Sequence, residues 1–318
     1  MKLKYNLKLP TSVYAATEIG KRLYVGGSDW NRRKTRYTKE IARKAKGILH
    51  IFQKGKAGFI EEKKVFFPSM VYSVLQLPNK KLFVGCKSGK GTLNIVGMDG
   101  RIIKQKDDEI GKGVYSSVFN TKKNEIILTT RAGKLKIIDA RTLKLKAKLQ
   151  LSKPKTRLWS LKLDMKKQII YAGDYDGVLY VVDRKKHVKK FDLKTLYKGH
   201  ARLKKGFGPS LWGLELLNNK IVLGTRWGDV IILNKNLGVE KQIKFKEDIT
   251  CIKKFSKQTV LIGTRYGKLY LLNLKNYKQV KIKEIKPVLQ KENAIWDMTC
   301  VKNEVLVCFA DGNVCKVS

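Results

Sequence analysis

The chain has 318 residues, 43% of them hydrophobic, which is too apolar for a disordered protein. Lysine and arginine number 69 against 26 aspartate and glutamate residues, giving a net charge of +43 at pH 7. No apolar run approaches the roughly 18 residues of a membrane-spanning helix, and the N-terminus lacks the apolar segment of a signal peptide. We therefore expect a soluble, cytoplasmic protein without a membrane partner.

In chain order, a strand over residues 1–9 comes first and seven copies of a repeat follow. Each copy opens with an apolar residue, followed in most copies by an aromatic one. These openings are Val13-Tyr14, Val71-Tyr72, Val114-Tyr115, Leu158-Trp159, Leu211-Trp212, Ile249-Thr250 and Ile295-Trp296, spaced 38 to 58 residues apart. Two further apolar runs follow in each copy, and a glycine precedes the third run in most copies. Alternation with period 2 predicts strands, and the glycines suit hairpin turns.

Three strands and a looser fourth per copy predict an all-β fold, a seven-bladed β-propeller that forms a single domain over residues 1–318. The last copy stops after its third strand, near Ser318. We expect residues 1–9 to supply the missing strand of the last blade and to close the ring. Such closure removes an open strand edge, which would otherwise favour aggregation.

Residues 173–183 resemble the second half of a WD40 repeat. Val182-Asp183 and Ile138-Asp139 stand where that family has its Trp-Asp pair, and Leu233-Asn234 and Leu272-Asn273 resemble it more weakly. The resemblance covers nearly the whole chain and implies the strand order of WD40 proteins. In that order, the start of each inner strand and the turn after each second strand lie on one face, which we call the top face.

The resemblance therefore places two sets of residues on the top face. A ring near the axis contains Tyr14, Tyr72, Tyr115, Trp159, Trp212 and Trp296, and an outer set contains Trp30, Lys87, Arg131, Tyr175, Arg226, Trp227, Arg265 and Tyr266. Two basic insertions, residues 29–47 and residues 185–209, are expected on the same face, because insertions in repeat proteins often lie on the binding face. An aromatic residue repeated at the same position in most blades also fits a packing role between neighbouring blades.

Aromatic rings interleaved with cations are typical of proteins that bind single-stranded nucleic acid, since rings stack on bases and cations contact phosphates. We expect a non-catalytic protein that binds RNA or a ribonucleoprotein. The predicted nucleic-acid-binding residues are Trp30, Arg32, Arg33, Arg36, Lys87, Arg131, Trp159, Trp212, Arg226, Trp227, Arg265, Tyr266 and Trp296. The alternative is a scaffold that docks an acidic partner within a multisubunit complex. Lysines spread over every solvent face by a biased genome composition would explain the charge without either function.

Signals of catalysis are missing from the sequence. The three histidines, His50, His187 and His200, lie in no recognisable catalytic setting. Asp174 and Asp176 form a carboxylate pair, but Asp176-Gly177 is an ordinary hairpin signal. The five cysteines show no paired metal-ligand spacing, and no phosphate-binding loop pattern occurs. We therefore expect no enzyme activity, no metal, no cofactor and no small-molecule substrate.

Overall fold

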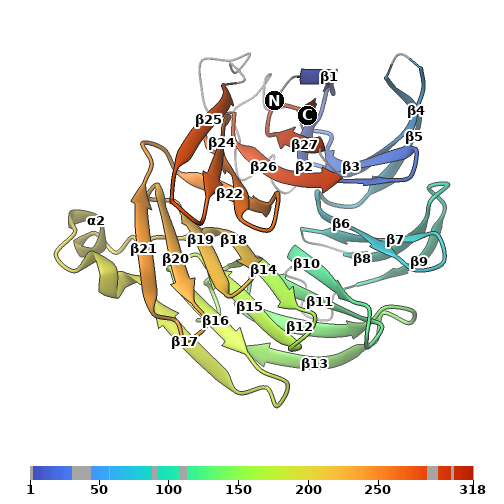
Figure 1. The fold of residues 1–318 in the computed structure, drawn as a ribbon. Helices are drawn as coiled ribbons and strands as arrows, with labels where there is room; N and C mark the ends of the chain where they lie inside the picture. The colour runs from blue at the N-terminus through green and yellow to red at the C-terminus, as the bar shows by residue number, and fades with distance from the viewer. Residues whose placement is uncertain are drawn as a thin grey trace. The chain divides into compact units, whose positions relative to one another are not determined.

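The computed structural model describes residues 3–30, 44–56, 58–87, 92–107, 113–284, 293–301 and 304–317. Within these residues the strands form seven four-stranded sheets (Figure 1). The first three sheets contain β2 (Ser12–Ile19), β3 (Arg22–Ser28), β4 (Gly47–Lys54) and β5 (Phe59–Phe67); β6 (Val71–Leu77), β7 (Lys81–Cys86), β8 (Leu93–Gly97) and β9 (Ile102–Lys106); and β10 (Val114–Asn120), β11 (Glu125–Thr130), β12 (Lys134–Asp139) and β13 (Leu145–Gln150).

Three more sheets follow the same order. They contain β14 (Leu158–Asp164), β15 (Ile169–Asp174), β16 (Val178–Val182) and β17 (Val188–Asp192); β18 (Leu211–Leu217), β19 (Lys220–Thr225), β20 (Asp229–Asn234) and β21 (Val239–Lys244); and β22 (Ile249–Lys254), β23 (Thr259–Thr264), β24 (Lys268–Asn273) and β25 (Gln279–Glu284). Consecutive strands pair with one another in every sheet, so each sheet is one propeller blade. The predicted all-β, seven-bladed propeller fold is confirmed.

The seventh sheet joins the two ends of the chain. Its order is β1-β28-β27-β26, with β1 (Leu3–Lys8), β26 (Ile295–Val301), β27 (Glu304–Phe309) and β28 (Asn313–Val317). Strand β1 runs antiparallel to β28, and Leu9 donates a backbone hydrogen bond to Gly312 at 2.9 Å. Figure 1 shows the blue N-terminal strand beside the red C-terminal ones. The prediction that residues 1–9 complete the last blade is confirmed.

The chain divides into two compact units, each with its own apolar core. The first comprises Met1–Phe119, Tyr266–Lys268 and Ile282–Ser318, and the second comprises Asn120–Arg265 and Leu269–Lys281. The first unit thus holds the sheets that begin with β2, β6 and β26. The second holds β11–β13, the sheets that begin with β14 and β18, and most of the sheet that begins with β22.

A buried ion network in the first unit links the last blade to the first. Lys316 on β28 is 3% exposed, and its Nζ lies 2.8 Å from Glu18 on β2 and 2.7 Å from Glu304 on β27. Burial alone would lower the pKa of Lys316, but the hydrogen bonds to both carboxylates hold it above its usual value. Buried charge therefore ties the closing sheet to the first blade.

Candidate nucleic-acid interface

A β-bulge opens the first strand of most sheets. In six sheets the pairing between the first and second strands skips one residue of the first strand. The skipped residue is the second of the two residues that open each sequence repeat. The residues at these shifts are Tyr14, Tyr72, Trp159, Trp212, Thr250 and Trp296. A bulge residue is left out of the ladder and its side chain is aimed away from the regular strand direction. The repeated aromatic residues are thus positioned by a backbone irregularity that period-2 alternation does not reveal.

In the second unit, two of these bulge residues form a stacked indole pair. The rings of Trp159 on β14 and Trp212 on β18 lie 5.7 Å apart between centroids, with an interplanar angle of 26°. Both side chains are partly exposed. The guanidinium carbon of Arg226 lies 5.4 Å from the Trp212 ring centroid, within the range of a cation–π contact. The two blades therefore present a layered stack of a cation and two indoles.

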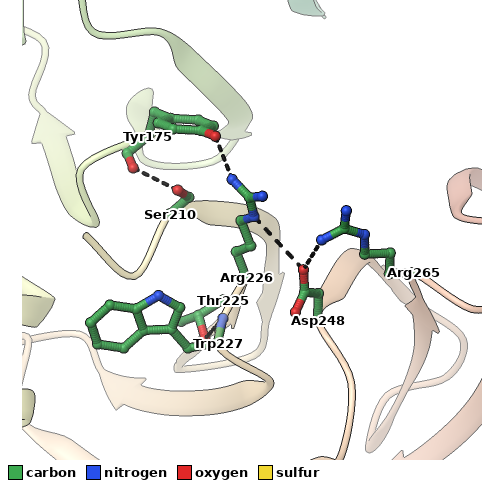
Figure 2. Close-up of polar contacts among 7 residues, drawn as sticks. All are labelled: Tyr175, Ser210, Thr225, Arg226, Trp227, Asp248 and Arg265. Atoms are coloured by element: carbon green, nitrogen blue, oxygen red, sulfur yellow. Dashed lines mark hydrogen bonds and ion pairs between the residues drawn. The ribbon is translucent and has the colours of Figure 1, made fainter. Parts of the chain in front are cut away.

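The Arg226 guanidinium is held by two neighbours (Figure 2). It donates a hydrogen bond to the Tyr175 hydroxyl, and its Nε lies 3.7 Å from Oδ2 of Asp248. Arg265 donates to the same Asp248 oxygen at 2.9 Å. The backbone is fixed as well, because the Arg226 N–H donates to the Ser210 carbonyl at 2.9 Å. These contacts orient Arg226 toward Trp212 before any ligand binds.

Charged side chains of both signs surround this stack. The guanidinium of Arg157 lies 5.6 Å from the Tyr175 ring, and Arg226 and Arg265 share the single carboxylate of Asp248. Asp174, next to Tyr175 in the chain, is buried, and burial raises its pKa. It accepts hydrogen bonds from the Tyr180 hydroxyl and the Val178 N–H, as a hairpin residue does.

Trp227, predicted as a nucleic-acid-binding residue of the top face, is buried. Its side chain is 7% exposed and stacks on His200, with centroids 4.6 Å apart, while Tyr197 meets it edge-on at 5.0 Å. The physical reason is the basic insertion itself, whose short helices η1 (Leu193–Tyr197) and α2 (Ala201–Lys204) contribute residues that cover the indole. Residues 188–192 of that predicted insertion are the fourth strand β17, so the added segment begins at Leu193.

Two further predicted residues are buried in the first unit. Trp30 is 8% exposed and packs with Ala45 and Met70. Lys87 is also 8% exposed, and its Nζ lies 5.9 Å from the Tyr72 ring centroid. These side chains serve packing in this structure, so we remove Trp30, Lys87 and Trp227 from the candidate site.

The remaining predicted residues fall into three groups. Arg131 and Tyr266 are exposed, and Trp296 is partly exposed at its bulge. Arg32, Arg33 and Arg36 lie outside the described residues. In the first unit the tyrosines of the predicted ring contact one another: Tyr72 lies 4.7 Å from Tyr14 and 5.5 Å from Tyr115 between centroids. The predicted ring thus combines packing between blades with partial exposure.

Sequence reasoning missed a polar chain in the first blade. His50 forms two side-chain hydrogen bonds. Its Nε2 lies 3.0 Å from the Thr11 hydroxyl, and its Nδ1 lies 2.5 Å from a carboxylate oxygen of Glu61. Burial lowers the pKa of His50, which is 1% exposed, and Thr11 is 7% exposed. The three residues resemble a nucleophile, base and acid in order, but the hydroxyl is buried, so we assign them to the packing of the blade. No local sequence motif indicates this arrangement, because the three residues come from separate segments of the chain.

The described residues contain neither a membrane-spanning helix nor a metal-binding cluster. No helix in the described part of the chain is long and apolar enough to cross a membrane. No cluster of three or more His, Cys, Asp or Glu side chains there is arranged to hold a metal ion.

Comparisons with known proteins identify the fold but not a relative in sequence. No protein-family model matches the chain, and no curated protein sequence matches it. Among solved structures, the chain is similar to the crystal structure of the WD40 β-propeller domain of Doa1, with a TM-score of 0.75 and 15% sequence identity over 99% of this chain and 96% of that one. At this identity the likeness concerns the fold alone. Together with the seven four-stranded sheets, it shows that the chain is a WD40-like seven-bladed β-propeller.

Proposed function

We propose that this propeller is a non-catalytic binding protein for RNA or a ribonucleoprotein, and that unpaired bases bind at Trp159, Trp212 and Arg226. The observation that carries the proposal is the partly exposed stack of two indoles and one guanidinium on adjacent blades. Flat rings and a flat cation offer stacking faces to any base, so such a surface tolerates different sequences. WD40-like propellers commonly act as binding scaffolds, and the ligand proposed for this one is RNA or a ribonucleoprotein.

The overall charge supports a polyanionic ligand but does not locate it. In the second unit, exposed lysines lie on the fourth strands, far along each sheet from the indole pair. They include Lys146 and Lys148 on β13, Lys189 and Lys190 on β17, and Lys241 and Lys244 on β21. This spread supplies general attraction to phosphate. Selectivity for unpaired RNA must then come from the aromatic stack.

Replacing Trp212 by Leu tests the stack. Leucine keeps an apolar side chain at the bulge but removes the stacking face under Arg226. Because base–aromatic stacking contributes about 1–3 kcal/mol per base, we expect the affinity for a labelled short oligouridine to fall about 5- to 150-fold. Fluorescence anisotropy at constant salt measures the change, and the melting temperature shows that the variant is folded.

A control variant that removes charge and keeps the indoles separates stacking from electrostatics. The exposed residues Lys122, Lys123, Lys166 and Lys167 lie in the turns between β10 and β11 and between β14 and β15. Changing all four to Ala removes four charges and leaves the indoles intact. If Trp212→Leu keeps its oligouridine affinity while this quadruple variant loses affinity, the stack is not the binding site and the proposal is wrong.

A further inference from the structure

A crevice of about 250 Å³ opens in the second unit, away from the indole stack. Its walls come from β11, β12 and β13 on one side and from the sheet of β14 to β17 on the other. At the rim lie residues of the turns that precede β11 and β15 and that follow β16. The indole pair instead lies where β14 and β18 begin. The crevice is therefore a separate surface from the proposed RNA site.

Aliphatic side chains line the crevice, together with Asn120 and Gln168, which are hydrogen-bonded to each other at 2.7 Å. Ile127, Ile170 and Val182 form its buried part, while Ile137, Leu149 and Leu163 are only partly covered. Pockets for drug-sized ligands usually have about 300–1,000 Å³, so this volume suits one or two apolar side chains better. Covering these partly exposed aliphatic residues with a partner removes apolar surface from water, which stabilises the complex.

The rim of the crevice is cationic. Lys123, Lys146, Arg184 and Lys186 line it with two carboxylates, Glu125 and Asp183. Glu125 is already paired with Lys146 at 2.7 Å, and Asp183 contacts His187 at 3.2 Å. Four cationic side chains against two carboxylates leave the rim with a net positive charge.

Positive charge continues beyond the rim. The turn between β14 and β15 carries Lys166 and Lys167, and Arg184 donates to the backbone carbonyls of both. Desolvation, and then the neighbouring charge of Lys167, lower the pKa of Lys235. Crowded cations of this kind favour an anionic ligand that relieves their repulsion.

We propose that this crevice binds an acidic peptide segment of a partner protein, which inserts an apolar side chain between the third and fourth blades. Peptide carboxylates on either side of the inserted apolar residue would face Lys123, Lys186 and the cations beyond them. The crevice favours a peptide over a nucleic acid, because its lining residues include no aromatic ring on which a base could stack. This site goes beyond the proposed RNA function and does not depend on it.

The test uses the full chain and three labelled probe peptides. Each is a short run of Asp and Glu with one central residue, which is Leu, Phe or Gly. Burial of a Leu or Phe side chain predicts binding about 10- to 150-fold tighter than that of the Gly peptide, measured by fluorescence anisotropy at constant salt. Equal affinities for all three peptides would overturn the proposal.

Two variants place the peptide in the crevice. Ala147→Trp fills the crevice and is expected to remove the advantage of the Leu and Phe peptides over the Gly peptide. The double variant Lys123→Glu, Lys186→Glu is expected to weaken all three peptides at least about tenfold, since it reverses two rim charges. A matched double variant, Lys153→Glu, Lys155→Glu, changes the same charge in the exposed loop before β14 and should have a much smaller effect.

Three results contradict the site. One is an unchanged preference for apolar centres in Ala147→Trp, and another is equal weakening by the two double variants. The third is a competition result. If oligouridine displaces the Leu peptide from the wild-type chain but not from Ala147→Trp, the crevice binds nucleic acid. Failure of the Trp212→Leu test leaves these measurements unaffected, so the two proposals are tested separately.

Discussion

Deleting residues 1–9 is expected to lower the free energy of unfolding by at least about 5 kcal/mol. The deletion removes β1 and leaves the outer edge of β28 unpaired along the register from Leu3–Val317 to Lys8–Asn313. It also removes the buried Leu9, which packs with Val13 and Val314. Each backbone hydrogen bond contributes about 1 kcal/mol net, and each buried leucine about 1.5–3 kcal/mol. Urea unfolding followed by circular dichroism measures the loss.

A complementation experiment controls this deletion. A synthetic peptide of residues 1–9, added to the truncated chain, should restore much of the lost stability in a concentration-dependent way, because binding to the folded state alone shifts the equilibrium. The point variant Leu9→Ala should have an intermediate effect. A truncated chain that unfolds at the same urea concentration as the full chain would contradict closure of the propeller by its N-terminal strand.

Affinity for single-stranded RNA is expected to fall steeply with salt. If six to ten phosphates contact lysine and arginine, the loss between about 50 and 200 mM salt is on the order of 10³–10⁵-fold, because condensed counterions are released on binding. The net charge of +43 and the lysines along the fourth strands make this number of contacts attainable. Titrations of oligouridine by fluorescence anisotropy at several salt concentrations give the slope.

Salt alone does not distinguish RNA from an acidic protein, since both bind less tightly as salt screens charge. Nuclease treatment of the purified protein adds that distinction: material that absorbs at 260 nm and disappears on treatment with ribonuclease is RNA. An oligouridine affinity that is flat across the salt series would show that the high positive charge is not the source of binding.

The fold was predictable because its signal is repeated. Seven copies of an apolar opening followed by alternating runs report the same blade seven times, so the weakness of any one copy matters little. The spare strand at residues 1–9 and the incomplete last copy then indicated closure. The bulges at Trp159 and Trp212 were not predictable, since a register shift depends on how two strands pair rather than on the order of residues in one of them.

The candidate site was predictable only in part. Trp212 and Arg226 lie 14 residues apart in the sequence, and strand order alone suggested that they share one end of a blade. Trp227 follows Arg226 directly, yet the helices at residues 193–204 bury it. Sequence reasoning treated that insertion as a basic surface and missed its apolar residues, Leu193 and Tyr197, which pack on the indole. Contacts between a loop and a turn of another blade carry no periodic signal.

The most direct test of RNA binding at the indole stack is photo-crosslinking. A short oligouridine containing 4-thiouridine is bound to the full chain, irradiated and digested, and the crosslinked peptides are identified by mass spectrometry. We expect crosslinks concentrated in the peptides that carry Trp159, Trp212 and Arg226, and their loss from Trp212→Leu. Crosslinks confined to the lysine-bearing turns before β11 and β15, or spread evenly over the fourth strands, would contradict RNA binding at the indole stack.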